Sequence, residues 1–262
     1  MTIKLLGVFA HPDDDVYSLG ATLIAHRDEL ETTLVFATSG EAGPITDPEA
    51  VPREELGAVR ETEQRAAMEA LGVAESTTSR FLRLPDYYLP DVPFEDLVGQ
   101  ITDVLLGVRP DVVVTFGPDG MTSHHDHIRV GEATTAAFDG LGPEDAPASL
   151  FHVALPRADV DRFYAHLDEA TGYGEEGDLF DVTGVPDEQI AVRFDARPYL
   201  ATKLEAILAH RTQICEWERI PESLRWIYLD EEAFVQARPR SDDVHARSDL
   251  FAGIGASDGA RS

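Results

Sequence analysis

Two short segments hold the residues best suited to metal-dependent chemistry. The first is His11-Pro12-Asp13-Asp14-Asp15 and the second is His124-His125-Asp126-His127. Imidazole and carboxylate groups are ligands that zinc accepts, and a catalytic zinc site combines three protein ligands with one position open to water. Such a site supplies a nucleophile at neutral pH, which the hydrolysis of an amide requires.

The spacing within each segment lets its side chains converge. His11 and Asp14 are three residues apart on a predicted strand-to-helix turn, so both can reach one ion. His124 and His127 are also three apart and share one face in the first turn of a predicted helix. One of these two histidines would complete the metal site while the other faces the substrate, and the spacing does not decide which.

A purely structural interpretation also exists for the carboxylates. Asp14 or Asp15 could simply cap a helix, as aspartates at this position often do. Ser123 and Asp126 fit a capping box at the start of the second helix. We favour the metal site because two dense ligand clusters each follow an apolar strand.

The chain alternates predicted strands and helices, which indicates an α/β, Rossmann-like fold with a mostly parallel sheet flanked by helices. Ligands of such sheets bind at the carboxyl ends of the strands, where both segments lie. Strands are predicted at 3–10, 32–38, 81–84, 111–116, 150–155 and 190–194, and helices at 17–29, 53–71, 94–108, 124–138 and 199–211. We predict one domain over 1–252, with an insertion or lid at 157–188 and a flexible tail at 253–262.

The charge balance narrows the possible partners. The 262 residues include 49 Asp and Glu against 21 Lys and Arg, a formal net charge of −28. This excess would repel nucleic acid and anionic membranes, and it suggests a protein adapted to high salt. No apolar run approaches the roughly 18 residues of a membrane span, so we expect no membrane anchor. Three aspartates follow the first apolar run, which does not fit a signal peptide, so we predict a cytoplasmic protein.

Several common motifs are missing. The first predicted strand is followed by neither Gly-x-Gly-x-x-Gly nor a P-loop, which argues against dinucleotides and nucleoside triphosphates. The sequence contains no His-Glu-x-x-His and no Gly-x-Ser-x-Gly. A metallo-β-lactamase-like His-x-His-x-Asp-His motif is interrupted at Thr122. The lone Cys215 excludes a disulfide framework, and we expect it to be a packed core thiol.

The two segments resemble the signatures of a known family. Residues 10–15 resemble the Ala-His-Pro-Asp-Asp-Glu motif of the LmbE-like or PIG-L zinc-dependent N-deacetylases, and residues 124–127 resemble its His-Pro-Asp-His motif. Weaker similarities cover residues 38–41, 60–63 and 84–86 and a late helix with Lys203 and residues 210–213. This chain departs from the family pattern at four positions, which are Asp15, Ala21, His125 and Thr212.

The resemblance implies a role for each matching residue. It implies a Zn²⁺ site made by His11, Asp14 and His127, with Asp13 as general base. It implies that His124 stabilises the oxyanion or donates a proton to the leaving amine, and that Asp126 orients a histidine. Candidate substrate contacts are Arg60, Asp86 and His210, although His210 could equally be a structural helix residue, and His125 could add a metal contact.

The implied activity is removal of an N-acetyl group from an N-acetylglucosamine-type sugar conjugate, so the expected partner is a small sugar molecule. One alternative is a zinc amidase that acts on a different acyl group or amide. Another is a non-catalytic metal-binding protein, which a spare carboxylate at Asp13 argues against. A homo-oligomer is compatible with the sequence, which does not reveal the oligomeric state.

Overall fold

The computed structural model describes residues 2–171, 182–240 and 246–254. Within them, seven strands form one sheet in the order β3-β2-β1-β4-β5-β7-β6. Strands β1 to β5 run parallel, whereas β7 is antiparallel to both β5 and β6. The α/β fold with a mostly parallel sheet is therefore confirmed. The strands are β1 (Ile3–Phe9), β2 (Leu30–Phe36), β3 (Thr77–Phe81), β4 (Val112–Phe116), β5 (Ser149–Ala154), β6 (Val192–Asp195) and β7 (Glu231–Arg238).

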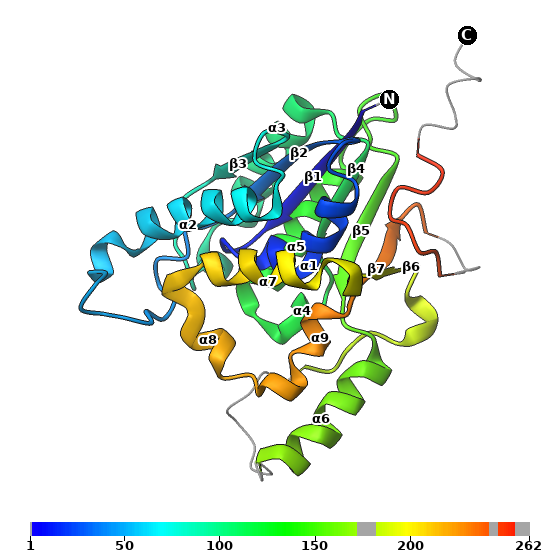
Figure 1. The fold of residues 1–262 in the computed structure, drawn as a ribbon. Helices are drawn as coiled ribbons and strands as arrows, with labels where there is room; N and C mark the ends of the chain where they lie inside the picture. The colour runs from blue at the N-terminus through cyan, green and yellow to red at the C-terminus, as the bar shows by residue number, and fades with distance from the viewer. Residues whose placement is uncertain (1, 172–181, 241–245, 255–262) are drawn as a thin grey trace.

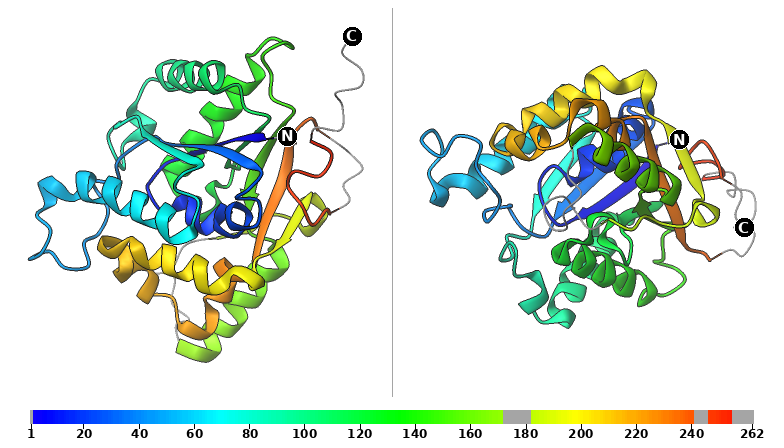
Figure 2. Two further views of the ribbon diagram at one scale, coloured as in Figure 1. Left: turned by 45° about the horizontal axis from the view of Figure 1, so that its top comes forward. Right: turned by 90° about the horizontal axis from the view of Figure 1, so that it is seen from below.

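Helices cover both faces of the sheet. Helices α1 (Asp14–Ala25), α2 (Leu56–Leu71) and α7 (Leu200–Ala209) pack together on one face, and α3 (Phe94–Val108) and α5 (His125–Asp139) on the other (Figure 2). The central strand β1 is a nearly continuous apolar run because it is covered on both sides. The carboxyl ends of β1 and β4, which are paired neighbours, consequently open to the same edge.

A glycine lets α5 approach the sheet closely. A Cβ atom on Gly131 would lie 2.4 Å from the carbonyl oxygen of Phe116, the last residue of β4. A larger residue would therefore push the helix away from the strand. The first turn of α5 is thus held over the edge where β1 and β4 end.

Four further helices lie at this carboxyl edge (Figure 1). They are α4 (Gly120–Ser123), α6 (Arg157–Thr171), α8 (Ile214–Glu218) and α9 (Trp226–Leu229). Helix α6 forms the first part of the segment expected to be an insertion or lid. Residues 172–181 and most of the expected tail lie outside the described residues, so both expectations stay predictions.

Some element boundaries differ from those predicted. The strand expected at 81–84 is wrong, because β3 is Thr77–Phe81 and Arg83 turns with φ 56°. As an edge strand with alternating exposure, β3 lacks the apolar run that marks a buried strand. Strand β7 escaped prediction since it begins with two glutamates. Helix α1 starts earlier than predicted, at Asp14 rather than residue 17.

The apolar core extends through most of the chain. One cluster of buried side chains runs from Ile3 to Phe251 and includes both faces of the sheet. Cys215 is half-buried rather than packed in this core, which corrects the expectation for it. Among the described residues, none of the helices combines the length and the apolarity needed to cross a membrane.

Candidate active site

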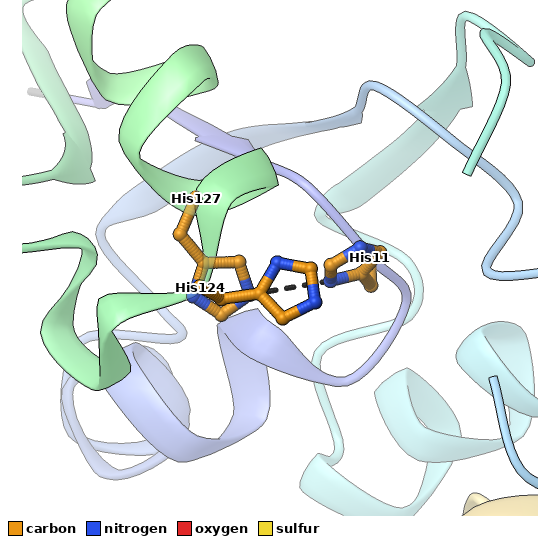
Figure 3. A group of neighbouring side chains, drawn as sticks. All are labelled: His11, His124 and His127. Atoms are coloured by element: carbon orange, nitrogen blue, oxygen red, sulfur yellow. Dashed lines mark hydrogen bonds between the residues drawn. The ribbon is translucent and has the colours of Figure 1, made fainter. Parts of the chain in front are cut away.

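The two polar segments meet where β1 and β4 end. His11 lies in the turn after β1, Asp14 begins α1, and His127 belongs to the first turn of α5. Figure 3 shows the ring of His127 beside that of His11, with His124 next to both. His11 Nδ1 is 3.2 Å from His127 Nε2, and Asp14 Oδ1 is 3.3 Å from the same nitrogen. The tertiary structure therefore brings together the three residues expected to bind the metal.

Hydrogen bonds orient His11 so that Nδ1 faces this cluster. Its Nε2 lies 3.0 Å from Asp86 Oδ1 and 3.4 Å from Asp126 Oδ2. Carboxylates accept hydrogen bonds, so Nε2 carries a proton and Nδ1 of the neutral ring keeps its lone pair. Carboxylates in this outer position commonly orient metal-binding histidines.

The tautomers of His127 and His124 differ, and this separates their roles. His127 Nδ1 donates to the carbonyl oxygen of Gly120 at 3.0 Å, which leaves a lone pair on Nε2 toward His11. His124 Nδ1 instead accepts from the backbone N–H of Asp126 at 3.2 Å, so Nε2 of the neutral ring carries its proton. His127 therefore presents a lone pair toward His11, whereas His124 presents an N–H on Nε2. One ring nitrogen from each of His11, His124 and His127 lies within 4.8 Å of the other two.

The donor set fits a zinc ion. Two nitrogen lone pairs and a carboxylate oxygen face one another, an arrangement that needs a cation or a proton between them. Ligands about 2.0–2.1 Å from a tetrahedral zinc ion are separated by about 3.3 Å. His127 Nε2 lies 3.2 Å from His11 Nδ1 and 3.3 Å from Asp14 Oδ1, close to that value, and the other carboxylate oxygen, Asp14 Oδ2, is 3.7 Å from His11 Nδ1. These residues would hold the ion.

The electrostatic field at this point favours positive charge. Burial lowers the pKa of His11, but hydrogen bonds to Asp126 and Asp86 and the charge of Asp14 outweigh burial and raise the pKa to about 10. His127 remains neutral, because burial and the charge on His11 lower its pKa to about 3. Without a metal, the ring of His11 therefore carries a second proton on Nδ1 at neutral pH, and a metal ion bound at Nδ1 would displace that proton.

Asp13 lies beside the ligands with a different environment. It precedes α1 with φ 111°, and its Oδ2 accepts from Arg60 Nη2 at 3.1 Å. Burial raises the pKa of Asp13 to about 7, although the charge of Arg60 opposes the shift. A carboxyl group that titrates near neutral pH is suited to act as a general base.

Asp126 ties the site to the loop after β3. Its carboxylate accepts from the backbone N–H groups of Tyr87 (2.7 Å) and Leu89 (3.1 Å) and also contacts His11. The capping box expected from Ser123 and Asp126 is wrong, because the N-cap of α5 is His124. The ring of His124 takes the place of the serine as the acceptor for the N–H of Asp126.

His125 points to the loop rather than to the three ligands. Its Nε2 is 2.7 Å from the carbonyl oxygen of Tyr87, and its ring meets the Tyr87 ring edge-on at 4.5 Å. Tyr87 itself has φ 70°, a region that is strained for a non-glycine residue. His125 therefore helps to hold the loop that carries Asp86 and Tyr87.

The candidate substrate contacts differ in their accessibility. Arg60 and Asp86 both line the cavity, but each already bonds protein groups. Arg60 donates to the carbonyl oxygens of Pro12 and Gly40, and Asp86 accepts from the N–H of Ala42. His210 is buried outside the cavity lining, and neither ring nitrogen has a partner among the described residues. Their substrate roles stay predictions.

A cavity of about 390 Å³ opens over the cluster. This volume lies within the range of small-molecule sites. The sequence analysis did not assign several lining residues to the site, because most of them come from short helices and loops that no periodicity marks. They are Tyr17, Met121, Gln213, Glu216, Trp217, Ile220 and Tyr228.

Backbone strain gathers around the same cavity. Asp13, Tyr87 and Met121 all line it, and all have positive φ although none is glycine. Each such residue costs about 1–3 kcal/mol and persists only where its surroundings enforce it. The strain marks this edge of the sheet as the functional one.

The fold and this cluster define an α/β enzyme with a candidate metal centre at the carboxyl edge of its sheet. The family model described as GlcNAc-PI de-N-acetylase (PIG-L) matches residues 6–138. This chain belongs to that family, whose named relatives are deacetylases and therefore hydrolases of amide C–N bonds.

Similar sequences support this assignment, and a solved structure shares the fold. A 1D-myo-inositol 2-acetamido-2-deoxy-alpha-D-glucopyranoside deacetylase of Streptomyces avermitilis is 33% identical over 289 residues, covering 96% of this chain and 97% of the relative. The enzyme of the same name from Acidothermus cellulolyticus is also 33% identical, over 82% of this chain and 80% of its own. The N,N'-diacetylchitobiose deacetylase of Pyrococcus horikoshii shares the fold, with 22% identity, a TM-score of 0.60 and coverage of 97% and 87%.

Proposed function

We propose that this protein is a zinc-dependent N-deacetylase that acts on an N-acetylglucosamine-type sugar conjugate. The observation that carries the proposal is the group of His11, Asp14 and His127 with Asp13 immediately beside it. A structural metal site would need no adjacent carboxyl group with a pKa near 7. The relatives named as glucosaminyl-inositol deacetylases support a sugar substrate.

The residues of the chain divide the work of hydrolysis between them. A bound zinc ion would polarise the amide carbonyl and lower the pKa of a water molecule to about 7. Asp13 accepts a proton from the attacking water and is placed to return one to the departing amine. His124 donates from Nε2 to the carbonyl oxygen, where negative charge develops. Asp86 and Asp126 hold His11 in its tautomer.

Zinc rather than another divalent ion is supported by the donor set, since two imidazoles and one carboxylate suit a tetrahedral zinc site.

A cytoplasmic location and a high-salt habitat stay predictions from the sequence. The acidic composition argues for an uncharged sugar conjugate over a polyanionic one.

Asp13→Asn tests the assignment directly. We expect kcat for acetate release from an N-acetylglucosaminide to fall about 10²–10⁴-fold, because the base is lost. Zinc content should stay at the wild-type level, whereas His11→Ala should lose the metal. Asp96→Asn, an exposed aspartate on α3, is the matched control and should retain full activity. Near-normal turnover by Asp13→Asn would refute the assignment of the base.

A further inference from the structure

The cavity over the metal cluster has two chemically different halves. One half presents charged and hydrogen-bonding groups, namely Asp13, Arg60 and Asp86. The other half is mainly apolar, although it also includes Glu216; its apolar side chains are Tyr17, Met121, Trp217, Ile220 and Tyr228. We call these five residues the apolar wall.

The apolar wall begins next to the metal-binding residues. Tyr17 follows Asp13 and Asp14 by one turn of α1, so it lies on the same face of that helix. Its ring lies 5.9 Å from that of Trp217 on α8 and 5.7 Å from that of Tyr228 on α9. Helices α1, α4, α8 and α9 converge at this end of the molecule (Figure 1).

Met121 is the member of the apolar wall that lies nearest in sequence to His124. It lies in the short helix α4 that precedes His124, with φ 61°, and it is 9% exposed. Its sulfur accepts from Ser18 Oγ at 3.9 Å, which links it to α1. The unbranched thioether of methionine fills irregular space and yields to ligands of different shapes.

Two smaller cavities share lining residues with the apolar wall. A second cavity of about 20 Å³ is bordered by Tyr17, Met121 and Tyr228, and a third of about 10 Å³ by Ile220 and Tyr228. A single water-sized probe fills about 10–15 Å³, so each space corresponds to about one carbon of an acyl chain. The main cavity of about 390 Å³, which these residues also line, has room for more than the methyl group of an acetyl substituent.

The amide substrate has two parts, the sugar and the acyl group, and each can lie in one half of the cavity. A sugar carries hydroxyl groups, which lose hydrogen bonds to water unless the protein replaces them. The polar half offers such partners, whereas the apolar wall favours the acyl group, because burial of apolar surface is favourable. Tyr17 lies one turn of α1 from Asp14, so the apolar wall begins next to the residues that would bind the metal.

We propose that the apolar wall is an acyl pocket and that this enzyme hydrolyses N-acyl groups longer than acetyl, up to about butyryl. The inference rests on the proposed function and adds the acyl specificity. The reaction is hydrolysis in each case: the C–N bond breaks, the acyl carbon gains oxygen from water, and the amine gains a proton. The products are the free amino sugar and a short fatty carboxylate.

The test compares acyl groups on one sugar. N-acetyl, N-propionyl, N-butyryl and N-hexanoyl derivatives of methyl glucosaminide are incubated with zinc-loaded protein, and release of the free amine is followed. We expect kcat/KM for the propionyl and butyryl derivatives to lie within about tenfold of that for the acetyl derivative. A pocket that fits only acetyl would instead lower kcat/KM about 10–200-fold for the first added methylene. Cleavage of acetyl with kcat/KM for propionyl reduced more than about tenfold would overturn the inference.

Variants of Met121 locate the pocket. Met121→Ala enlarges it and should raise the butyryl-to-acetyl ratio of kcat/KM about tenfold, and Met121→Phe should lower the ratio by a similar factor. Met68→Ala is the matched control, because Met68 is also buried but lies on α2 outside the cavity. The butyryl-to-acetyl ratio of kcat/KM for Met68→Ala should equal that of the wild type. Circular dichroism confirms folding, and the wild-type series and Met121→Phe decide the question if Met121→Ala does not fold.

Each remaining outcome has a distinct meaning. An unchanged ratio in both Met121 variants would overturn the acyl pocket. The Met121 variants could instead change the ratio of kcat/KM between the methyl and phenyl glycosides of N-acetylglucosamine and leave the butyryl-to-acetyl ratio unchanged. That result would show that the apolar wall binds the aglycone, which also overturns the acyl pocket. No amine release from any derivative by zinc-loaded protein would refute the proposed N-deacylase function itself.

Discussion

At the scale of single residues, the site depends on which nitrogen of each histidine carries a proton. Asp86 and Asp126 fix His11, the carbonyl of Gly120 fixes His127, and the N–H of Asp126 fixes His124. The three rings lie within 5.2 Å of one another, centroid to centroid, yet these partners give them different tasks. A change of partner should therefore affect metal binding without removing a ligand.

Asp126→Asn is expected to lower zinc affinity about 10–100-fold, because the carboxylate that orients His11 is lost. Competition with a chromophoric chelator would measure the affinity. Asp145→Asn, a surface carboxylate paired with Arg109, should leave it unchanged. Equal affinities in wild type and Asp126→Asn would show that Asp126 serves only the loop at Tyr87 and Leu89.

His210 gives a prediction for the dependence of stability on pH. Burial, aided by the charge of Arg60, lowers its pKa to about 3 from the usual 6.5. The unfolded chain therefore binds a proton before the folded chain does, and stability falls as the pH drops from 6.5 to about 3, by up to about 1.4 kcal/mol per pH unit. His210→Gln should flatten this part of the profile in urea unfolding. A slope equal to that of the wild type would contradict the burial of a neutral histidine.

At the scale of elements, a buried ion pair positions helix α1, which carries Asp14. Lys203 of α7 lies 2.7 Å from Glu232 of β7, and both side chains are 0% exposed. Glu232 also accepts from the backbone N–H groups of Ala21 and Thr22, and Lys203 donates to the carbonyl oxygen of Tyr17. The pair thus joins α1, α7 and the antiparallel strand β7.

Lys203→Met should destabilise the fold by about 3–5 kcal/mol, because it leaves Glu232 buried without its cation. Urea unfolding measures this change. Lys203→Met combined with Glu232→Gln should recover part of the loss, and Asp145→Asn, which breaks an exposed pair, should cost less than about 1 kcal/mol. A cost for Lys203→Met no larger than that of this exposed pair would contradict the positioning role.

At the scale of the whole molecule, the net charge of −28 dominates the response to salt. Self-repulsion opposes the compact state, and the Debye length shortens from about 30 Å at 0.01 M to about 3 Å at 1 M. We expect the Tm to rise with NaCl concentration, by about 2–4 °C for each kcal/mol of relieved repulsion. Sucrose, which does not screen charge, is the control. A Tm independent of NaCl would reject adaptation to high salt.

The expected strands and helices are confirmed where an apolar pattern was continuous or strongly periodic. The run over β1 and the amphipathic pattern of α3, whose bounds match the prediction at Phe94–Val108, are examples. Prediction failed at β3 because this edge strand alternates in exposure. It failed at β7 because a strand with a buried glutamate lacks a continuous apolar run. The capping box at Ser123 failed since a histidine side chain takes the place of the serine.

The sequence by itself determined the fold class, the ligand types and the two segments that carry them. These properties follow from local patterns: apolar runs specify buried strands, and short spacings place ligands on one turn. The tertiary structure alone decided that the rings of His11, His124 and His127 meet beside Asp14, and that aromatic side chains of α8 and α9 complete the cavity. Those facts depend on contacts between residues more than 80 positions apart, which local patterns do not encode.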